Sequence, residues 1–512
     1  MQSDKKKSNV LKIALFATGI SGIVAEYILS TLASYFIGDA VVQFALIVST
    51  MLFSMGLGSR LSKYIDTDLL AHFIYLELAL SFLVSFCAIL VYVTYGRYSP
   101  VFIYFLAIVV GLLIGLEIPI VTRLNQEFEE LKINVASILE KDYYGSLVGG
   151  LFFAFVGMPY LGLTYTPFVL GMLNFLVAFW TFIQLKNRIV AKHQKRISIL
   201  FFIIGSTILG GLIFAKPIIQ YGDQKKYRDK IIYQEQTKYQ KIVITQWQNN
   251  YSLFINSNLQ LSSFDEFMYH EPLVHPVMQI AETPQKVLIL GGGDGCAVRE
   301  ILKYKTVEDI TLVDLDPAMT RLAKTHQAFL SMNRNALSND KVKIVIDDAF
   351  QFLEKNNTVY NVIIIDLPDP NNVDLNKLYT KEFYFLCHKH LAKNGALITQ
   401  AGSPYYATKA FYCIEKSLQA SGFHTLPLQN QVLTMGQWGW ILASKSLDKK
   451  TLKQKLDTTN FESLNLLWLN NSAGKKISLF GKTLIDTTQI EVNTMFNPVL
   501  YRYYRSGNWK LY

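Results

Sequence analysis

The sequence has little charge for its length. Charged residues make up 17% of its 512 positions, against about a quarter in an average soluble domain, while hydrophobic residues make up 51%. Cysteine is scarce as well. The four cysteines, Cys87, Cys296, Cys387 and Cys413, lack the spacing of a metal site, and we expect them to be buried thiols. This composition excludes an ordinary soluble protein and offers no cysteine-based metal site.

The shortage of charge is concentrated in residues 1–216. Several apolar stretches there approach the roughly 20 residues that an α-helix needs to cross a bilayer. They lie at about 9–33, 37–58, 69–95, 100–121, 144–163, 165–185 and 197–216. The first stretch runs too far for a signal peptide and has no convincing cleavage site. We therefore predict a multi-pass α-helical membrane domain at 1–216, with about seven helices and a lipid bilayer as its partner.

The net charge of +10 lies largely in short loops beside these stretches, which indicates contact with anionic lipid and argues against nucleic-acid binding. Basic loops after the second, fourth and sixth stretches predict a cytoplasmic N-terminus. Seven spans would then put the C-terminal half outside the cell, whereas the basic segment "KPIIQYGDQKKYRDK" after the last span favours the cytoplasm. Either the stretch 144–163 is re-entrant or miscounted, or the C-terminal half faces outward. Our prediction is an inner-membrane protein with its C-terminal half in the cytoplasm.

From about residue 217 the pattern becomes that of a water-soluble fold. Alternating runs such as "YQKIVITQW" predict a small antiparallel β-domain at 217–280. Residues 281–445 alternate apolar strands, such as "KVLILGGG", with helices, which predicts a Rossmann-like α/β domain with a parallel sheet covered on both faces. The extension at 446–512 has no predicted role.

A glycine-rich turn follows the first strand of this α/β domain, in "VLILGGGDGCAVRE" at 287–300. Such turns usually hold phosphate at a helix N-terminus, but Asp294 would repel an anion, and the third glycine of the dinucleotide fingerprint is missing. We therefore predict that Asp294 binds positive charge.

Further aspartates follow the next three strands. They are Asp314 and Asp316, Asp347 and Asp348, and Asp366 and Asp369. Because the carboxyl ends of parallel strands meet at one edge of a sheet, these side chains should line one acidic crevice. Asp314 stands where an acidic residue commonly holds ribose hydroxyls, so the crevice should bind a cationic nucleoside such as a sulfonium.

The motifs over roughly 238–445 resemble the spermidine synthase family of polyamine aminopropyltransferases, in its membrane-anchored bacterial branch. In order they are "YQKIVI", "DEFMYHEPLVHP", "VLILGGGDG", "LVDLD", "DDAFQFL", "DLPDP", "LYTKEFY", "QAGSP" and "GQWGWILASK". The ending "NPVLYRYY" resembles that branch as well. The resemblance implies transfer of an aminopropyl group from decarboxylated S-adenosylmethionine to an amine such as putrescine, which gives spermidine and methylthioadenosine. It also implies a possible homodimer.

By motif, the resemblance assigns the acceptor side of the site. Asp366 would be the catalytic proton acceptor, while Asp369 and Tyr269 would help to hold the acceptor amine. His270 and Asp294 would address the aminopropyl amine or the polyamine. The chemistry agrees, because an attacking amine must lose a proton and a nearby carboxylate can accept it. This chemistry requires no metal and no cofactor, and we expect neither.

The resemblance also assigns the nucleoside side. Gln240 and Asp314 would bind the nucleoside, Asp314 through its ribose, while Asp348 and Ala349 would contact the adenine. The soluble enzymes usually have glutamate in place of Asp314 and glycine in place of Ala349. We expect the contacts to survive these changes.

Two other functions remain open. A membrane-bound methyltransferase using intact S-adenosylmethionine would have a similar sheet and loop. A sensor or transporter of polyamines could use the same crevice without catalysis. The carboxylates of "YHE" and "DLPDP" favour aminopropyl transfer, because a second acidic cluster suits an ammonium group better than the carboxylate of methionine.

Overall fold

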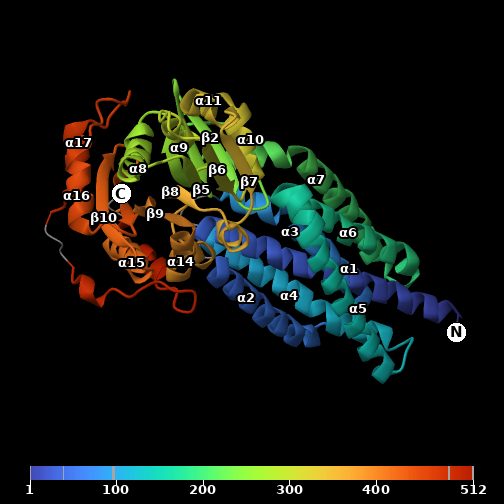
Figure 1. The fold of residues 1–512 in the computed structure, drawn as a ribbon. Coiled ribbons are helices and arrows are strands. Elements are labelled where there is room, and N and C mark those ends of the chain that lie inside the picture. Colours follow the sequence, from blue (N-terminus) through green and yellow to red (C-terminus); the bar gives the residue numbers. More distant parts are fainter. Residues whose placement is uncertain (1, 39, 95–98, 482–484, 510–512) are drawn as a thin grey trace. The chain divides into compact units, whose positions relative to one another are not determined.

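The computed structural model describes residues 2–38, 40–94, 99–481 and 485–509 (Figure 1). The chain divides into two compact units, Met1–Arg228 and Asp229–Tyr512.

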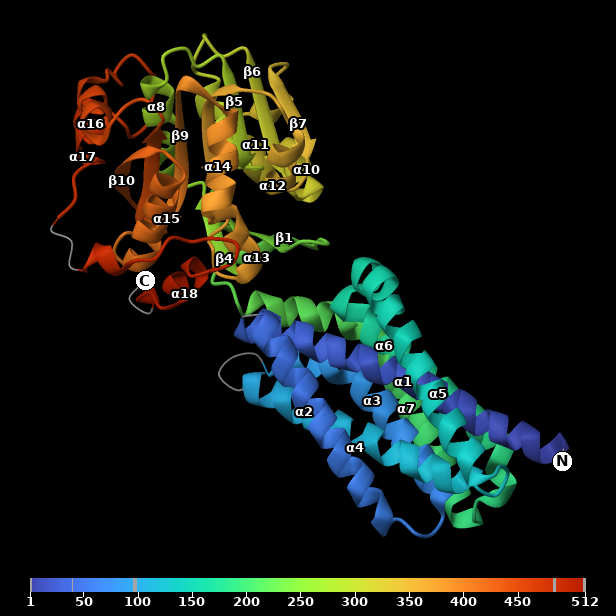
Figure 2. The same ribbon diagram turned by 60° about the horizontal axis from the view of Figure 1, so that its bottom comes forward.

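The first unit is built from long apolar helices (Figures 1 and 2). They are α1 (Gln2–Ile37), α2 (Ala40–Leu61), α3 (Leu69–Val93), α4 (Ser99–Asn125), α5 (Leu131–Phe152), α6 (Gly162–Leu185) and α7 (Ala191–Gln224), and a π-helical segment, η2 (Phe153–Leu161), joins α5 to α6. Six helical segments of the described chain are long and apolar enough to cross a membrane, and the fifth runs from Leu131 to Arg188. The predicted multi-pass helical architecture is confirmed.

The fifth of these segments contains two antiparallel arms. A straight helix would put Gly149 and Asn174 about 38 Å apart, at about 1.5 Å per residue. Yet Gly149 of α5 lies against Ile20 of α1, and Asn174 of α6 accepts a hydrogen bond of 2.7 Å from Ser21 of α1. The chain turns at Gly162, whose φ of +60° is a conformation that favours glycine. The chain therefore passes along the helical unit twice within this segment.

The chain enters and leaves the helical unit at opposite ends. Near the start of α1, Lys12 pairs with Glu129 at 2.6 Å, in the loop between α4 and α5. Near the end of α1, the Tyr35 hydroxyl donates a hydrogen bond of 3.3 Å to Asp223 of α7. The helix α7 continues past the predicted boundary at 216, because Ile219 is buried in the apolar core of the unit. The ends of α1 and α7 thus meet, far from the start of α1.

The second unit begins with a four-stranded antiparallel sheet. Its strands, β1 (Lys230–Gln236), β2 (Lys241–Trp247), β3 (Asn250–Ile255) and β4 (Asn258–Ser262), pair in sequence order, as the alternating pattern predicts. The next element is the helix α8 (Phe267–Ile280), which is buried on nearly every side although it contains Pro272 and Pro276. Burial against both sheets stabilises a helix that local propensity would disfavour.

The remaining strands form one seven-stranded sheet. They are β5 (Lys286–Gly291), β6 (Asp309–Asp314), β7 (Val342–Ile346), β8 (Tyr360–Asp366), β9 (Leu391–Gly402), β10 (His424–Val432) and β11 (Gly436–Ser444), in the order β10-β11-β9-β8-β5-β6-β7. The strands β5 to β9 are parallel, and β11 runs antiparallel to both of its neighbours. The predicted Rossmann-like sheet is confirmed, with one antiparallel strand near its edge.

Helices cover both faces of this sheet (Figure 1). One face carries α8, α9 (Cys296–Ile301), α10 (Pro317–Thr325) and α11 (Gln327–Asn333), and the other carries α12 (Ala349–Lys355), α14 (Lys381–His390) and α15 (Thr408–Ala420). The C-terminal extension contributes α16 (Lys449–Thr458) to the first face and α18 (Leu500–Arg505) to the second, with α17 (Asn471–Lys476) between them in the chain. The extension is therefore an integral part of the second unit.

Candidate active site

Carboxylates from three neighbouring strands converge at the carboxyl edge of the sheet, whereas the sequence predicts four strands, with Asp348 among them. Asp314 ends β6, Asp294 follows β5, and Asp366 ends β8. The glycine-rich turn makes this convergence possible. A Cβ atom on Gly293 would lie 2.3 Å from Asp314 Oδ2, and one on Gly291 would lie 2.1 Å from the Asp366 carbonyl oxygen. The glycines therefore provide room for two strand ends that carry carboxylates.

Asp366 lies between a tyrosine and a histidine of α8. The Tyr269 hydroxyl donates a hydrogen bond of 2.7 Å to Asp366 Oδ1. His270, Asp294 and Asp366 each bring a nitrogen or oxygen atom within 4.8 Å of the others. Burial raises the pKa of Asp366 to about 6, although the positive charge of His270 and the Tyr269 hydrogen bond oppose the rise. Asp366 is therefore a carboxylate at neutral pH that can still accept a proton.

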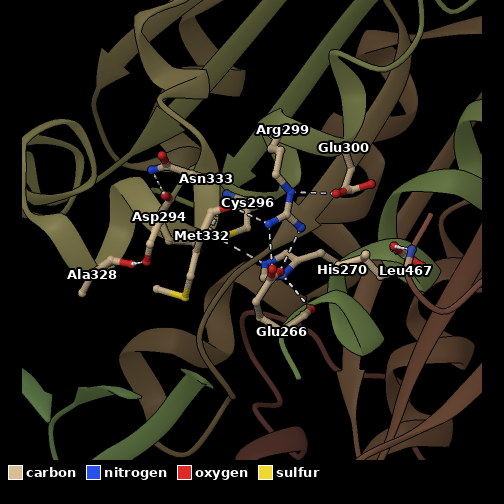
Figure 3. A network of polar contacts seen from close by, with 12 residues as sticks. Glu266, His270, Asp294, Cys296, Arg299, Glu300, Ala328, Met332, Asn333 and Leu467 are labelled. Atoms are coloured by element: carbon tan, nitrogen blue, oxygen red, sulfur yellow. Dashed lines mark hydrogen bonds and ion pairs between the residues drawn. The ribbon is translucent and has the colours of Figure 1, made fainter. Parts of the chain in front are cut away.

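A buried ionic network holds His270 in place (Figure 3). His270 Nδ1 lies 2.8 Å from a carboxylate oxygen of Glu266, and both oxygens of Glu266 accept hydrogen bonds from Arg299, at 2.6 and 3.0 Å. Arg299 Nε donates to Glu300 at 2.7 Å. Burial lowers the pKa of His270, but the hydrogen bond to Glu266 and the charges of Asp294 and Glu266 outweigh it, and the pKa rises to about 9. His270 is thus a cation. Its Nε2 atom lies 3.8 Å from a carboxylate oxygen of Asp294.

Asp369 is held at both carboxylate oxygens. The Tyr504 hydroxyl donates to Oδ2 at 2.7 Å, and Gln400 Nε2 donates to Oδ1 at 3.2 Å. Burial raises the pKa of Asp369 to about 6, against the effect of these two hydrogen bonds. Tyr379 stabilises the loop that carries Asp369. Its hydroxyl donates to the carbonyl oxygens of Leu367 and Pro368, at 3.1 and 3.0 Å.

On the side of the site predicted to bind the nucleoside, the loop between β1 and β2 contacts the aspartate that follows β6. Gln240, in the loop between β1 and β2, donates to Asp316 Oδ2 at 3.0 Å, and Thr237 donates to the same oxygen at 2.7 Å. The Asp316 backbone amide donates to Asp314 Oδ1 at 2.9 Å. Burial raises the pKa of Asp314 to about 6. Gln240 and Asp314, predicted to bind one nucleoside, are both linked to Asp316.

Asp348 has a structural task at the start of α12. Its Oδ1 atom accepts the backbone N–H groups of Phe350 and Gln351, at 2.9 and 3.2 Å, and its Oδ2 atom pairs with Lys377 at 2.6 Å. Burial raises the pKa of Asp348, but the hydrogen bond and charge of Lys377 and the two backbone hydrogen bonds together outweigh this effect, and the pKa is lowered. Ala349 is buried beside it. The adenine contact assigned to both residues stays a prediction.

Two groups of side chains in the described residues have the spacing of a metal site. Glu266, His270 and Cys296 form one, and His270, Asp294 and Asp366 form the other. In the first group, Arg299 already neutralises Glu266 and would repel a cation. The second group is part of the acidic crevice, where an ammonium group would meet the same ligands. All four cysteines are buried free thiols, as expected.

Several site residues escaped the sequence analysis. Glu266 and Arg299 hold His270, and Gln400 and Tyr504 hold Asp369. The spacing of Glu266 and His270, four residues apart on one helix, was a usable signal. Tyr504 gave no such signal, because it lies 135 residues from its partner in the chain.

Comparisons with known proteins identify relatives of this chain. The family model of the spermine/spermidine synthase domain matches residues 266–455. The chain is 39% identical over 499 residues to a polyamine aminopropyltransferase of Leptospira interrogans, covering 96% of this chain and 97% of the relative. It is 40% identical over 509 residues to polyamine aminopropyltransferase 2 of Aquifex aeolicus, covering 98% and 99%. A solved spermidine synthase of Thermotoga maritima is 26% identical and covers 49% of this chain and 85% of that one, with a TM-score of 0.44.

Proposed function

The chain belongs to the polyamine aminopropyltransferase family, and we propose that its acidic crevice transfers the aminopropyl group of decarboxylated S-adenosylmethionine to a diamine such as putrescine. One observation carries the proposal: three carboxylates, Asp294, Asp314 and Asp366, gather at the carboxyl edge of the parallel sheet, where both substrates would bring positive charge.

In the proposed reaction, a neutral amine nitrogen attacks the methylene carbon next to the sulfonium. The new C–N bond forms as the C–S bond breaks, and the electron pair of that bond leaves with sulfur as a neutral thioether. The proton from the attacking nitrogen passes to Asp366, which is largely ionised at neutral pH because its pKa is about 6. The Tyr269 hydrogen bond keeps one Asp366 oxygen fixed, which supports a defined position for the base.

The other side chains would bind and orient the substrates. Asp294 would bind the amino group of the aminopropyl chain, the protonated His270 would act on it through Asp294, and Asp369 would hold the distal ammonium of the diamine. Each ammonium would form a charge-assisted hydrogen bond with a carboxylate that few waters reach. Bringing the attacking nitrogen and the sulfonium carbon into line would supply much of the rate.

The nucleoside would lie over the glycine-rich turn. We propose that Asp314 receives the ribose hydroxyls and that Gln240 closes over them from the antiparallel sheet. Asp348 and Ala349 would face the adenine. Since Lys377 and two backbone amides already occupy Asp348, an adenine amino group would have to share or replace the Lys377 contact.

The test is release of methylthioadenosine by the detergent-purified protein, given decarboxylated S-adenosylmethionine and a panel of amines. We expect release that depends on one short diamine and that falls by orders of magnitude in an Asp366→Asn variant. Methyl transfer from intact S-adenosylmethionine, with no release of methylthioadenosine from the decarboxylated form, would establish the methyltransferase alternative. Binding of polyamine without turnover would establish the sensor alternative.

We further propose that the enzyme needs no metal or other cofactor, because the sulfonium is already an activated leaving group and carboxylates suffice to bind the amines. A homodimer also stays a prediction, which light scattering of the purified protein would test.

The helical unit supports anchoring in a cell membrane, with six segments long enough to span it. The chain enters and leaves this unit at opposite ends. If the catalytic unit lies in the cytoplasm, which is the location that the sequence predicts, the start of α1 must lie outside. The basic loops near the start of α1 favour the reverse orientation. Reporter fusions at the two chain ends decide between them, and a cytoplasmic signal at the C-terminal end alone would support the predicted location.

A further inference from the structure

The C-terminal extension reaches into the amine side of the crevice. Tyr504, on the last helix of the chain, donates its hydroxyl to Asp369 Oδ2 at 2.7 Å. Gln400, on β9, donates to the other oxygen of Asp369 at 3.2 Å. The carboxylate proposed to hold the distal ammonium of the acceptor is thus oriented from two sides. One side belongs to the sheet and the other to the extension.

Several contacts attach the extension firmly to the α/β domain. Glu271 of α8, next to His270 in the chain, is fully buried and accepts three backbone hydrogen bonds of 2.6 to 2.9 Å. The donors are the N–H groups of Leu467, Trp468 and Leu469. Asn493 is also fully buried and donates to the carbonyl oxygens of Asn376 and Tyr379, at 3.2 and 3.1 Å. Leu500, in α18 itself, is wholly buried in the core. These contacts position the Tyr504 side chain rather than leaving it on a loose tail.

The Tyr504 ring is also packed from behind. Trp509 lies with its ring centroid 4.6 Å from that of Tyr504, and its indole N–H donates to the Tyr504 carbonyl oxygen at 2.7 Å. At the end of β9, a Cβ atom on Gly402 would lie 3.7 Å from the Tyr504 ring and 3.9 Å from Asp369 Oδ1. The phenol, the glycine and the carboxylate therefore meet at one place, and the ring fills the space beside Asp369.

We propose that the C-terminal extension closes the acceptor end of the amine site, and that Tyr504 is a positioning residue that orients Asp369 and restricts the acceptor to short amines. The inference rests on the proposed aminopropyl transfer. The neutral phenol and the Gln400 amide each use one acceptor position of Asp369 and leave the rest for a single ammonium. A longer amine would need the volume that the ring occupies.

The decisive variant is Tyr504→Phe, compared with Tyr503→Phe. Tyr503 is the neighbouring residue, and its hydroxyl lies 3.5 Å from Glu491 and not at Asp369. Loss of a hydrogen bond to a charged group should raise the KM for the diamine roughly tenfold or more in Tyr504→Phe. The KM for decarboxylated S-adenosylmethionine should change less than about twofold. Tyr503→Phe should leave both constants near the wild-type values.

A pH profile separates this role from mere packing. Asp369 is faced by Tyr504, by Gln400 and by the phenols of Tyr379 and Tyr269, and burial raises its pKa to about 6 while the Tyr504 hydrogen bond lowers it. Removing the hydroxyl should raise that pKa further. The acid limb of kcat/KM for the diamine should therefore move to higher pH in Tyr504→Phe and stay in place in Tyr503→Phe.

A Tyr504→Ala variant tests the restriction on length. It should raise the rate with a triamine relative to the rate with a diamine, whereas the Phe variant keeps the ring and should not. If Tyr504→Phe matches Tyr503→Phe in the diamine KM and in the pH profile, the inference is overturned while aminopropyl transfer stands. If the wild-type protein releases no methylthioadenosine with any amine, aminopropyl transfer itself is overturned, and the inference with it.

Discussion

Replacing Tyr269 by phenylalanine should alter the pH at which the enzyme loses activity. The Tyr269 hydroxyl donates a hydrogen bond of 2.7 Å to Asp366, the proposed base, and so favours the ionised carboxylate. The substitution leaves the ring in place and removes only the donor. Because the carboxylate loses a stabilising partner, its pKa should rise above its present value of about 6.

The size of the shift follows from the strength of the bond. A hydrogen bond to a charged group contributes about 1.5–3 kcal/mol, and one pKa unit corresponds to about 1.4 kcal/mol, so the upper limit is a rise of about one to two units. Only the ionised base accepts a proton. The kcat/KM of Tyr269→Phe, which reports the pKa of the free protein, should then be about five- to fiftyfold below wild type at pH 6, and the two should converge near pH 9.

The assay is methylthioadenosine release at subsaturating concentrations of both substrates, from pH 5.5 to 9, which gives kcat/KM. Tyr360→Phe is the matched control, since Tyr360 begins the strand that Asp366 ends and its hydroxyl contacts Asn356, 3.1 Å away. The control should keep the wild-type profile. An acid limb that stays in place in Tyr269→Phe, or a loss of activity that is equal at every pH, would refute the reasoning.

Three further outcomes follow from the same geometry. Asp366 has a raised pKa in the fold, so its contribution to stability should fall as pH rises from about 4 to 6, and an Asp366→Asn variant should gain in melting temperature relative to wild type across that window. Gly293→Ala would set a Cβ atom 2.3 Å from Asp314 Oδ2, and calorimetry should show roughly tenfold weaker binding of methylthioadenosine with a nearly unchanged melting temperature. Exhaustive treatment with a chelator should leave the rate unchanged, and a loss that zinc restores would contradict the expectation that no metal is needed.

The arrangement of the strand ends could be predicted from sequence because it depends on local patterns. Runs such as "NVIIIDLPDP" fix a buried strand and put Asp366 at its end, and parallel pairing then brings it beside the turn that carries Asp294. The helix α8 was harder to foresee. Pro272 and Pro276 interrupt the residue pattern from which a helix is predicted. Burial rather than helix propensity stabilises α8.

Contacts between distant segments could not be predicted in this way. Arg299 reaches Glu266 across 33 residues, and Tyr504 reaches Asp369 across 135. No spacing in the chain encodes such pairs, because they depend on how the folded elements pack. The pair of Tyr504 and Asp369 matters most for function. It connects the C-terminal extension, which had no predicted role, to the proposed binding site of the acceptor amine.

The glycine-rich turn explains the acidic character of this crevice. In phosphate-binding loops, missing side chains let backbone N–H groups approach an anion. Here the missing Cβ atoms of Gly291 and Gly293 let the Asp366 backbone and the Asp314 carboxylate approach the turn. Burial raises the pKa of both aspartates to about 6, and the charge of Asp294 adds to the rise in each, so in the free protein their ionised forms lack full compensation. A sulfonium and an ammonium supply the missing charge, and their binding should therefore lower both pKa values and keep the base ionised when the amine attacks.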